Sequence, residues 1–177
     1  MTTRHRVILV SLLLITGCST RSSGAPSEWV ETTATFDLGG QTAAPIPADR
    51  VLPDGNYWAV VNEVLGSDNI VFEVYQARFG TTCEKWATEN GMNEGCPDDY
   101  YVDSSTHQVL TTSNVKWVSV AESSAPGKNY RVAYSTLVRL VRGEKTSVPN
   151  GFSWTPFPFI LRVSNGDVTS IDQYWVP

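Results

Sequence analysis

The chain has 177 residues, with 13 basic and 18 acidic side chains and a net charge of −5 at pH 7. Its length suits one domain of ordinary size. The excess of acid argues against nucleic acid as a partner, because nucleic-acid binding relies on lysine and arginine. Six tryptophans and seven tyrosines are typical of a packed domain and argue against a disordered chain.

The first 18 residues predict export and a lipid anchor. Two arginines precede an apolar run over residues 7–15, which is too short to span a bilayer but fits the core of a signal peptide. Ile15-Thr16-Gly17-Cys18 follows and resembles the lipobox of bacterial lipoproteins, whose cysteine receives a diacylglycerol group. The resemblance implies a lipoprotein signal peptide over residues 1–17, lipidation of Cys18 and anchoring to the outer face of the cell membrane. The alternative is an ordinary signal peptide with an unrelated cysteine.

The cysteine count favours a disulfide. If Cys18 carries lipid, Cys83 and Cys96 remain, and an even number of cysteines outside the cytoplasm predicts a pair. A zinc site is disfavoured, since these two cysteines and His107 lack the paired spacing of zinc ligands. We expect neither a metal nor a cofactor.

Composition predicts three parts in the chain. Residues 1–17 would be removed, taking two basic residues and no acid, which leaves 160 residues with a net charge of −7. Residues 18–50 are expected to be a tether, because residues 19–27 are small and polar. Largely apolar residues alternate with polar ones over residues 30–38, which predicts a strand. This strand either packs on the domain or lies apart from it. Residues 51–177 are expected to form a single globular domain.

Within that domain, two hairpins and two short helices are expected. Strands at residues 57–64 and 70–77 would be joined by a turn at 66–69, and Asn165-Gly166 predicts a second hairpin between 157–163 and 168–176. A helix capped by Thr81 would end at Gly91. Residues 130–142 predict either a strand and a short helix capped by Ser135, or one helix. Further extended runs are residues 100–103, 108–112 and 115–121.

These elements predict an α+β, mostly β fold. Six to eight strands would form an antiparallel sheet, curled or barrel-like, with two short helices.

The search for catalytic chemistry finds no motif. His107 is the one histidine outside the predicted signal peptide, and no Gly-x-Ser-x-Gly elbow accompanies it. We therefore expect a solvated histidine in a turn and name no catalytic residue. A carboxylate pair for glycoside hydrolysis stays open, because the separation of the two groups is a three-dimensional property.

The segment from residue 83 to residue 103 is the most unusual, with six acidic side chains and one basic side chain. Its candidate ligand or calcium surface consists of Asp98, Asp99, Tyr100, Tyr101 and Asp103. The spacing of an EF-hand is absent, so a solvated acidic loop is the alternative. The pairs Tyr57-Trp58 and Tyr100-Tyr101 either line a ligand groove or place one ring in the core and its neighbour on the outer face.

Three segments resemble a loose group of exported actinobacterial proteins: Leu52-Pro53-Asp54-Gly55-Asn56-Tyr57-Trp58, Pro97-Asp98-Asp99-Tyr100-Tyr101, and the stretch from Asn165-Gly166 to Gln173-Tyr174 and Pro177. Asp98 stands where the group has asparagine, and the asparagines that follow Tyr101 in the group are missing. The resemblance covers residues 52–177 and implies no activity.

The sequence therefore predicts a lipid-anchored protein of the cell envelope, which is a non-enzymatic binding or structural module. Its partners would be the membrane, through the N-terminal lipid, and an envelope protein or small ligand, with no role for nucleic acid. The alternative is a small carboxylate-dependent hydrolase that acts on cell-wall material. The substrate-binding lipoprotein of an importer is disfavoured, because 160 residues is small for a two-lobed clamp.

Overall fold

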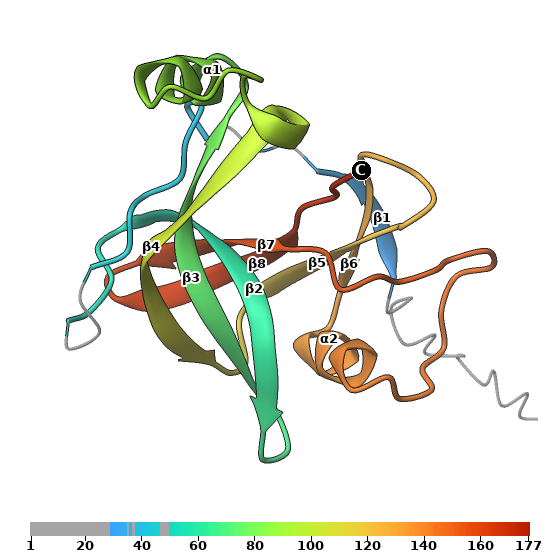
Figure 1. The fold of residues 1–177 in the computed structure, drawn as a ribbon. Coiled ribbons are helices and arrows are strands. Elements are labelled where there is room, and N and C mark those ends of the chain that lie inside the picture. Colours follow the sequence, from blue (N-terminus) through green and yellow to red (C-terminus); the bar gives the residue numbers. More distant parts are fainter. Residues whose placement is uncertain (1–28, 35, 37, 47–49) are drawn as a thin grey trace, which may run out of the picture.

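The computed structural model describes residues 29–34, 36, 38–46 and 50–177, and the predicted signal peptide with Cys18 lies outside them. The described chain forms one sheet of eight strands with two α-helices (Figure 1). The strands are β1 (Val30–Thr33), β2 (Gly55–Leu65), β3 (Asn69–Phe79), β4 (Tyr100–Thr112), β5 (Trp117–Ala121), β6 (Lys128–Val132), β7 (Phe159–Ser164) and β8 (Asp167–Gln173). Their order in the sheet is β1-β6-β5-β8-β7-β2-β3-β4.

The mostly β class, the eight strands and the two short helices confirm the predicted fold class, but the sheet is not purely antiparallel. Strands β5 and β8 pair in parallel, whereas every other neighbouring pair in the sheet is antiparallel. A parallel pair needs a long crossover, and the chain between β5 and β8 provides one through β6, a helix, a long loop and β7. The sheet also does not close into a barrel, since β1 and β4 stand at its two ends.

Both predicted hairpins are present. Strands β2 and β3 pair on either side of a turn that contains Gly66, and β7 and β8 pair on either side of Asn165-Gly166. Asn165 and Gly166 both have positive φ, at 54° and 82°. A two-residue hairpin turn of this type requires that conformation, which explains why Asn-Gly specifies it.

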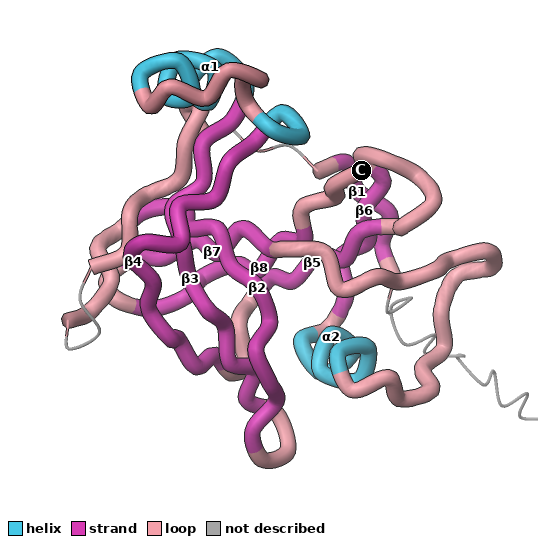
Figure 2. The backbone as a smooth tube through the Cα atoms, in the orientation of Figure 1, coloured by secondary structure: helices cyan, strands magenta, loops and turns pink. Residues whose placement is uncertain are grey.

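The two α-helices lie at different ends of the molecule (Figure 2). Helix α1 (Gly80–Glu89) follows β3 directly, with Phe79 as its N-cap and no side-chain cap, so the predicted cap at Thr81 is wrong. Helix α2 (Tyr134–Val141) follows β6, which confirms a strand and a helix and rejects a single helix over residues 130–142. Its N-cap is Ala133 and no side chain caps it, so the predicted cap at Ser135 is wrong.

The predicted turn around His107 is also wrong. Residues Tyr100–Thr112 form one strand, β4, in which a bulge sets the stretch from Asp103 to Gln108 against the shorter stretch Val74–Gln76 of β3. His107 lies on this bulged part of the strand, and its ring is 5.9 Å from that of Tyr75. The small polar residues before His107 are exposed on the last strand of the sheet, where an extended backbone needs no buried side chains.

One face of the sheet carries the main core. Alternate residues of the central strands are fully buried beneath α2, including Tyr57, Phe72, Phe159, Leu161 and Ile171. Helix α2 contributes Leu137, which has no exposed surface. We call this face the inner face, and the opposite face the outer face.

The N-terminal segment packs across the outer face. Strand β1 pairs with β6, and the chain then runs to Thr42, whose amide donates to the carbonyl of Ala77 at 2.8 Å. The hydroxyl of Thr42 accepts from the amide of Ala77, also at 2.8 Å. The described part of residues 28–46 therefore belongs to the sheet assembly and forms a wall over its outer face.

Candidate functional site

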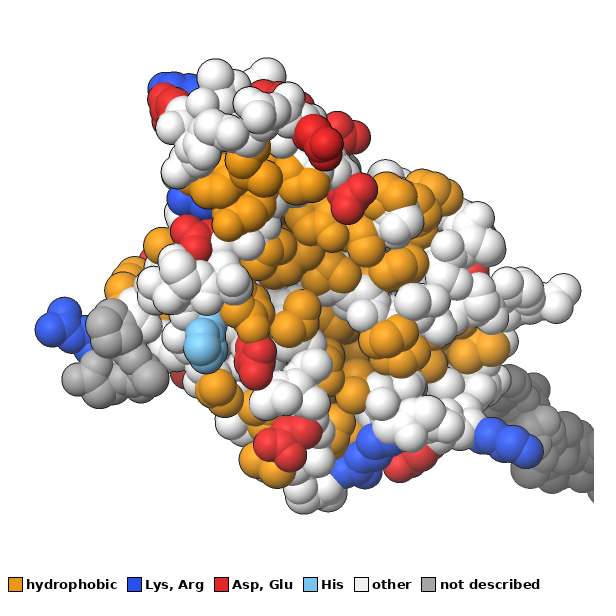
Figure 3. All heavy atoms as spheres, in the orientation of Figure 1, with side chains coloured by type: hydrophobic (Ala, Val, Ile, Leu, Met, Phe, Trp, Pro, Cys, Tyr) orange, Lys and Arg blue, Asp and Glu red, His pale blue; other side chains and the backbone are white. Residues whose placement is uncertain are grey.

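The outer face of the sheet carries a second apolar cluster, separate from the core. Trp58, Ala77 and Ile160 form its buried floor. Eight partly buried residues pack on that floor: Phe36, Leu38, Tyr75, Phe79, Tyr100, Val102, Tyr174 and Val176. In Figure 3, hydrophobic side chains gather between the α1 end of the molecule and the C-terminal end of the chain.

Five rings of this cluster, Phe36, Trp58, Phe79, Tyr100 and Tyr174, form a continuous set that we call the aromatic cluster. The ring of Trp58 lies 5.1 Å from that of Tyr100 and 5.5 Å from that of Tyr174, measured between centroids. Tyr174 also contacts Phe79 at 5.5 Å and Phe36 at 5.4 Å. These separations are typical of tilted aromatic pairs, and four of the five rings keep an exposed part.

A cavity of about 500 Å³ opens beside the aromatic cluster. Its lining, which we call the aromatic groove, is Ala34, Phe36, Leu38, Gly39, Gly40, Phe79, Gly127, Tyr174 and Trp175. Gly40 brings the N-terminal wall close to α1, since a Cβ at this position would lie 2.2 Å from the Thr82 hydroxyl oxygen. The volume falls within the range of small-molecule sites.

The two tyrosines of the aromatic cluster bring polar groups to it. Burial, and then the charge of Asp98, raise the pKa of Tyr100. Burial also raises the pKa of Tyr174, and the charges of Tyr100 and Asp99 add smaller contributions in the same direction. Both hydroxyls are therefore protonated at neutral pH, and neither forms a hydrogen bond to another described residue. They are left as donors and acceptors for a bound molecule.

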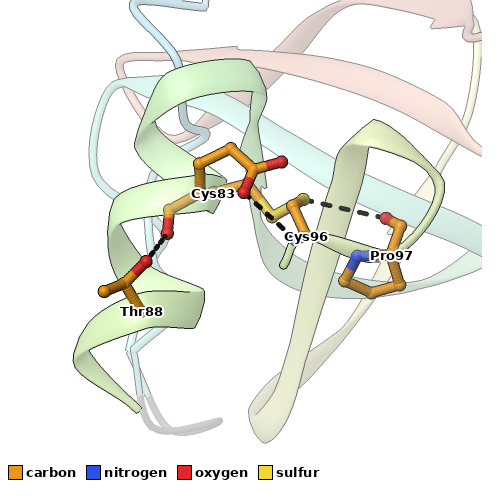
Figure 4. The surroundings of a disulfide bond; sticks show 5 residues. Cys83, Thr88, Cys96 and Pro97 are labelled. Carbon is orange, nitrogen blue, oxygen red and sulfur yellow. Dashed lines mark hydrogen bonds between the residues drawn. A yellow bond between two sulfur atoms is a disulfide. The ribbon is translucent and has the colours of Figure 1, made fainter. Parts of the chain in front are cut away.

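Two aspartates stand next to Tyr100, in the short 3₁₀ helix η1 (Pro97–Asp99). Asp98 and Asp99 are exposed and have φ values of 48° and 60°, in the left-handed region that residues other than glycine seldom adopt. The disulfide between Cys83 and Cys96 holds this turn against α1, with the two Cα atoms 5.5 Å apart (Figure 4). The Glu84 carboxylate accepts a hydrogen bond from the amide of Cys96 at 3.4 Å in the same place.

The structure divides the predicted ligand or calcium surface between two sides of β4. Tyr100 joins the aromatic cluster, whereas Tyr101 stacks on Trp86 of α1, with ring centroids 3.9 Å apart. Asp103 is engaged with Ser105 and lies 3.6 Å from a nitrogen of Arg78. Hydrogen bonds from Ser105 and the nearby Arg78 lower the pKa of Asp103. Of the five predicted residues, Tyr100 is the one that belongs to the aromatic cluster.

The aromatic pairs follow the alternation of their strands. Tyr57 is buried in the main core, and its hydroxyl donates to the carbonyl of Pro53 at 2.8 Å. Its neighbour Trp58 is in the aromatic cluster. One ring of this pair is therefore core and the other lies on the outer face, as one of the two alternatives predicted.

A second cavity, of about 250 Å³, lies over the other half of the outer face. We call it the polar hollow, because Arg131, Arg162, Asp172, Ser119 and Asn56 are among the residues that line it. Asp172 accepts a hydrogen bond from the Ser119 hydroxyl at 2.9 Å. The guanidinium of Arg131 lies over the ring of Trp117, 4.3 Å from its centroid. Ala34, Phe36 and Leu38 line both cavities, so the N-terminal wall runs between them.

The remaining acidic groups do not form a metal centre in the described part of the chain. No group of three histidine, cysteine, aspartate or glutamate side chains is placed to hold an ion there. The most buried carboxylate, Glu122, accepts hydrogen bonds from the amide of Ser153 at 3.1 Å and from the hydroxyl of Ser124 at 3.0 Å, and so ties a loop to the end of β5. Among the described helices, none combines the length and the hydrophobicity that a membrane crossing needs.

Sequence reasoning missed most of the groove. Phe36, Phe79, Tyr174 and Trp175 were not singled out, although Tyr174 belongs to the closing segment of the resemblance. All three segments of that resemblance contribute a ring to the aromatic cluster: Trp58, Tyr100 and Tyr174. The shared aromatic residues of these segments were the signal in the sequence. That the three rings meet on one face depends on the tertiary structure. No family model, curated protein or solved structure matches the chain.

Proposed function

We propose that the protein is a lipid-anchored binding module of the cell envelope, and that its ligand occupies the aromatic groove. One observation carries this proposal: four aromatic residues, Phe36, Phe79, Tyr174 and Trp175, converge on a cavity of about 500 Å³ outside the main core. A cavity of this size with an apolar lining and a few polar groups is the usual form of a small-molecule site.

These rings lie outside the main core. The inner face already holds a complete core, with Tyr57, Phe72 and Phe159 fully buried. Apolar side chains that gather on an open surface favour association and aggregation, so their presence there indicates a binding surface. The unpaired hydroxyl of Tyr174, which lines the groove, adds the capacity to orient a ligand.

A photocrosslinking experiment in the native envelope tests the groove. Phe36 is replaced with benzoylphenylalanine in the full chain, and Val109 is replaced in a matched control. Val109 is 53% exposed and lies on β4, away from the groove lining. We expect a discrete adduct from position 36 that is absent at position 109 and is lost when Tyr174→Leu removes a groove ring. Equal labelling from both positions would refute a ligand site in the groove.

The anchor has a separate test, because it depends on residues outside the described structure. Cys18→Ala should release the protein from membranes or leave it as an uncleaved precursor. A free Cys18 thiol by mass spectrometry, with unchanged partitioning into the membrane fraction, would contradict the lipid anchor. The disulfide is compatible with export, since such bonds persist in oxidising compartments.

A further inference from the structure

Among the residues that the structure describes, the lining of the aromatic groove contains no charged side chain. Its walls are rings, one leucine, one alanine and three glycines. The face of an aromatic ring carries partial negative charge, so a groove walled by four aromatic residues offers a negative surface without a formal charge. Such a surface attracts cations that shed their water easily.

Formal negative charge lies close to this surface. Asp98 and Asp99 immediately precede Tyr100, whose ring is part of the aromatic cluster. In Figure 3, acidic side chains border the hydrophobic area at the end of the molecule where α1 and η1 lie. Tyr174 lines the groove, and the charge of Asp99 adds to burial and to Tyr100 in raising its pKa.

The two basic residues that neighbour groove residues in the sequence each lie beside an acidic side chain. Arg78, which precedes Phe79, is placed 3.6 Å from Asp103 and over the Trp86 ring. Lys128, which follows Gly127, lies 3.3 Å from Glu31. Both of these side chains therefore have an acidic partner. Arg131 and Arg162 lie on the other side of the N-terminal wall, in the polar hollow that Asp172 also lines, and Arg131 lies over the Trp117 ring there.

The chemistry of the lining selects among cations. A metal ion prefers a set of oxygen ligands, and no such set of acidic side chains occurs in the described residues. A primary ammonium is compact and strongly hydrated, and it would need several hydrogen-bond acceptors to replace its water, whereas the described side chains of the lining offer one, the Tyr174 hydroxyl. An alkylated ammonium has a spread charge and an apolar surface, which suits ring faces.

We infer that the aromatic groove binds a small organic cation that carries an alkylated ammonium group, held against the rings of Phe36, Phe79 and Tyr174 and attracted by Asp98 and Asp99. This inference rests on the proposed function, because it names the ligand class of the same groove. The cavity volume commits it to a small molecule.

The test compares choline with its neutral isostere 3,3-dimethylbutan-1-ol, which has the same shape without the charge. Both are titrated into the full-length protein in a non-ionic detergent at low salt, and the indole N–H signals of the six tryptophans are followed by NMR. We expect choline to bind about tenfold more tightly than the alcohol, as for an added cation–π contact. Trp58 and Trp175 should shift, whereas Trp117 in the polar hollow should not.

Matched variants separate charge from ring. Asp98→Asn with Asp99→Asn removes both charges and keeps the backbone, since asparagine tolerates positive φ well. Choline binding should weaken roughly threefold at low salt and converge with the wild type at high salt. Tyr174→Phe should retain choline binding because the ring remains, whereas Tyr174→Leu should lose it.

Each result decides the inference. Equal affinity for choline and the alcohol would overturn the cation while leaving the groove as a binding site, so the proposed function would stand. Failure of choline to bind at millimolar concentration, or shifts centred on Trp117, would also overturn the inference. The crosslinking experiment would still decide the proposed function on its own.

Discussion

The two faces of the sheet have different relations to solvent. The inner face is closed by α2, and its large side chains, such as Leu137 and Phe72, have no exposed surface. The outer face is partly covered by the N-terminal wall and by Tyr174 and Val176 after β8, and it leaves two cavities open, one aromatic and one polar. The same alternation of side chains along β2, β7 and β8 supplies both faces.

This difference separates the residues needed for folding from those available for binding. Tyr57 and Trp58 are neighbours in β2, yet the first is sealed in the core and the second supports the aromatic cluster. Side chains on the inner face should control the free energy of unfolding. Side chains at the rim of the outer face should control ligand binding, with smaller effects on stability.

The largest effect on stability should come from the inner face. Leu137→Ala should lower the free energy of unfolding by about 2–5 kcal/mol, since it leaves a cavity in a fully buried site. Phe36→Ala, on the half-buried outer rim, should lower it by only about 1 kcal/mol. Urea denaturation of both variants measures the contrast, and similar losses would show that the aromatic cluster is a second core.

The next effect concerns the disulfide, which fixes α1 and η1 beside the aromatic cluster. Cys83→Ala with Cys96→Ala should lower the free energy of unfolding by about 3 kcal/mol in the chain-entropy model, for a sequence separation of 13 residues. The NMR shifts of the folded double variant should change at Trp86 and not at Trp117. Intact mass should show two hydrogens missing from the wild type. Two free thiols in protein taken from the envelope would contradict the bond, and unchanged stability would contradict its role.

A smaller effect depends on pH and involves Glu122. Burial alone would raise the pKa of this carboxyl, but hydrogen bonds from Ser153 and Ser124 outweigh it and lower the pKa below the ordinary value of 4.5. A lowered pKa in the folded state stabilises the protein above pH 4.5, and the gain is lost as the pH falls through the folded value. At pH 7, Glu122→Gln should therefore lower the free energy of unfolding by about 1–3 kcal/mol.

Thermal melts of Glu122→Gln and the wild type between pH 7 and pH 3 measure this effect. The gap between them should close at the acid end, while Glu94→Gln, at an exposed position, should track the wild type throughout. A gap that is constant with pH would show that Glu122 acts through its shape and not through its charge.

Local signals account for the parts of the fold that the sequence predicted. The turn at Gly66 and the pair Asn165-Gly166 need positive φ within a few residues, so their hairpins could be read from short segments. The parallel pairing of β5 with β8 could not, because it joins Val118 to Ile171 across β6, α2, a long loop and β7. No local pattern encodes such a long-range register.

The candidate site was predictable only in fragments, for the same reason. The alternation of Tyr57 and Trp58 placed one ring outward, and the acidic segment drew attention to Tyr100. The groove itself needs Phe36, Phe79 and Tyr174 to meet on one face, although they come from the N-terminal wall, the end of β3 and the segment after β8. Their convergence follows from the strand order of the sheet and from the path of the wall across it.

The smallest expected effect is that of calcium, which should leave the melting temperature of the full-length protein unchanged after chelation. Asp98 and Asp99 are exposed in η1, while Asp103 is engaged with Ser105 and Arg78 on β4. Calcium needs six to eight oxygen ligands around one point, and these three carboxylates do not converge on one. A rise of several degrees that disappears in the Asp98→Asn, Asp99→Asn variant would indicate a calcium site. In that case the acidic residues, and not the rings, would define the ligand of the outer face.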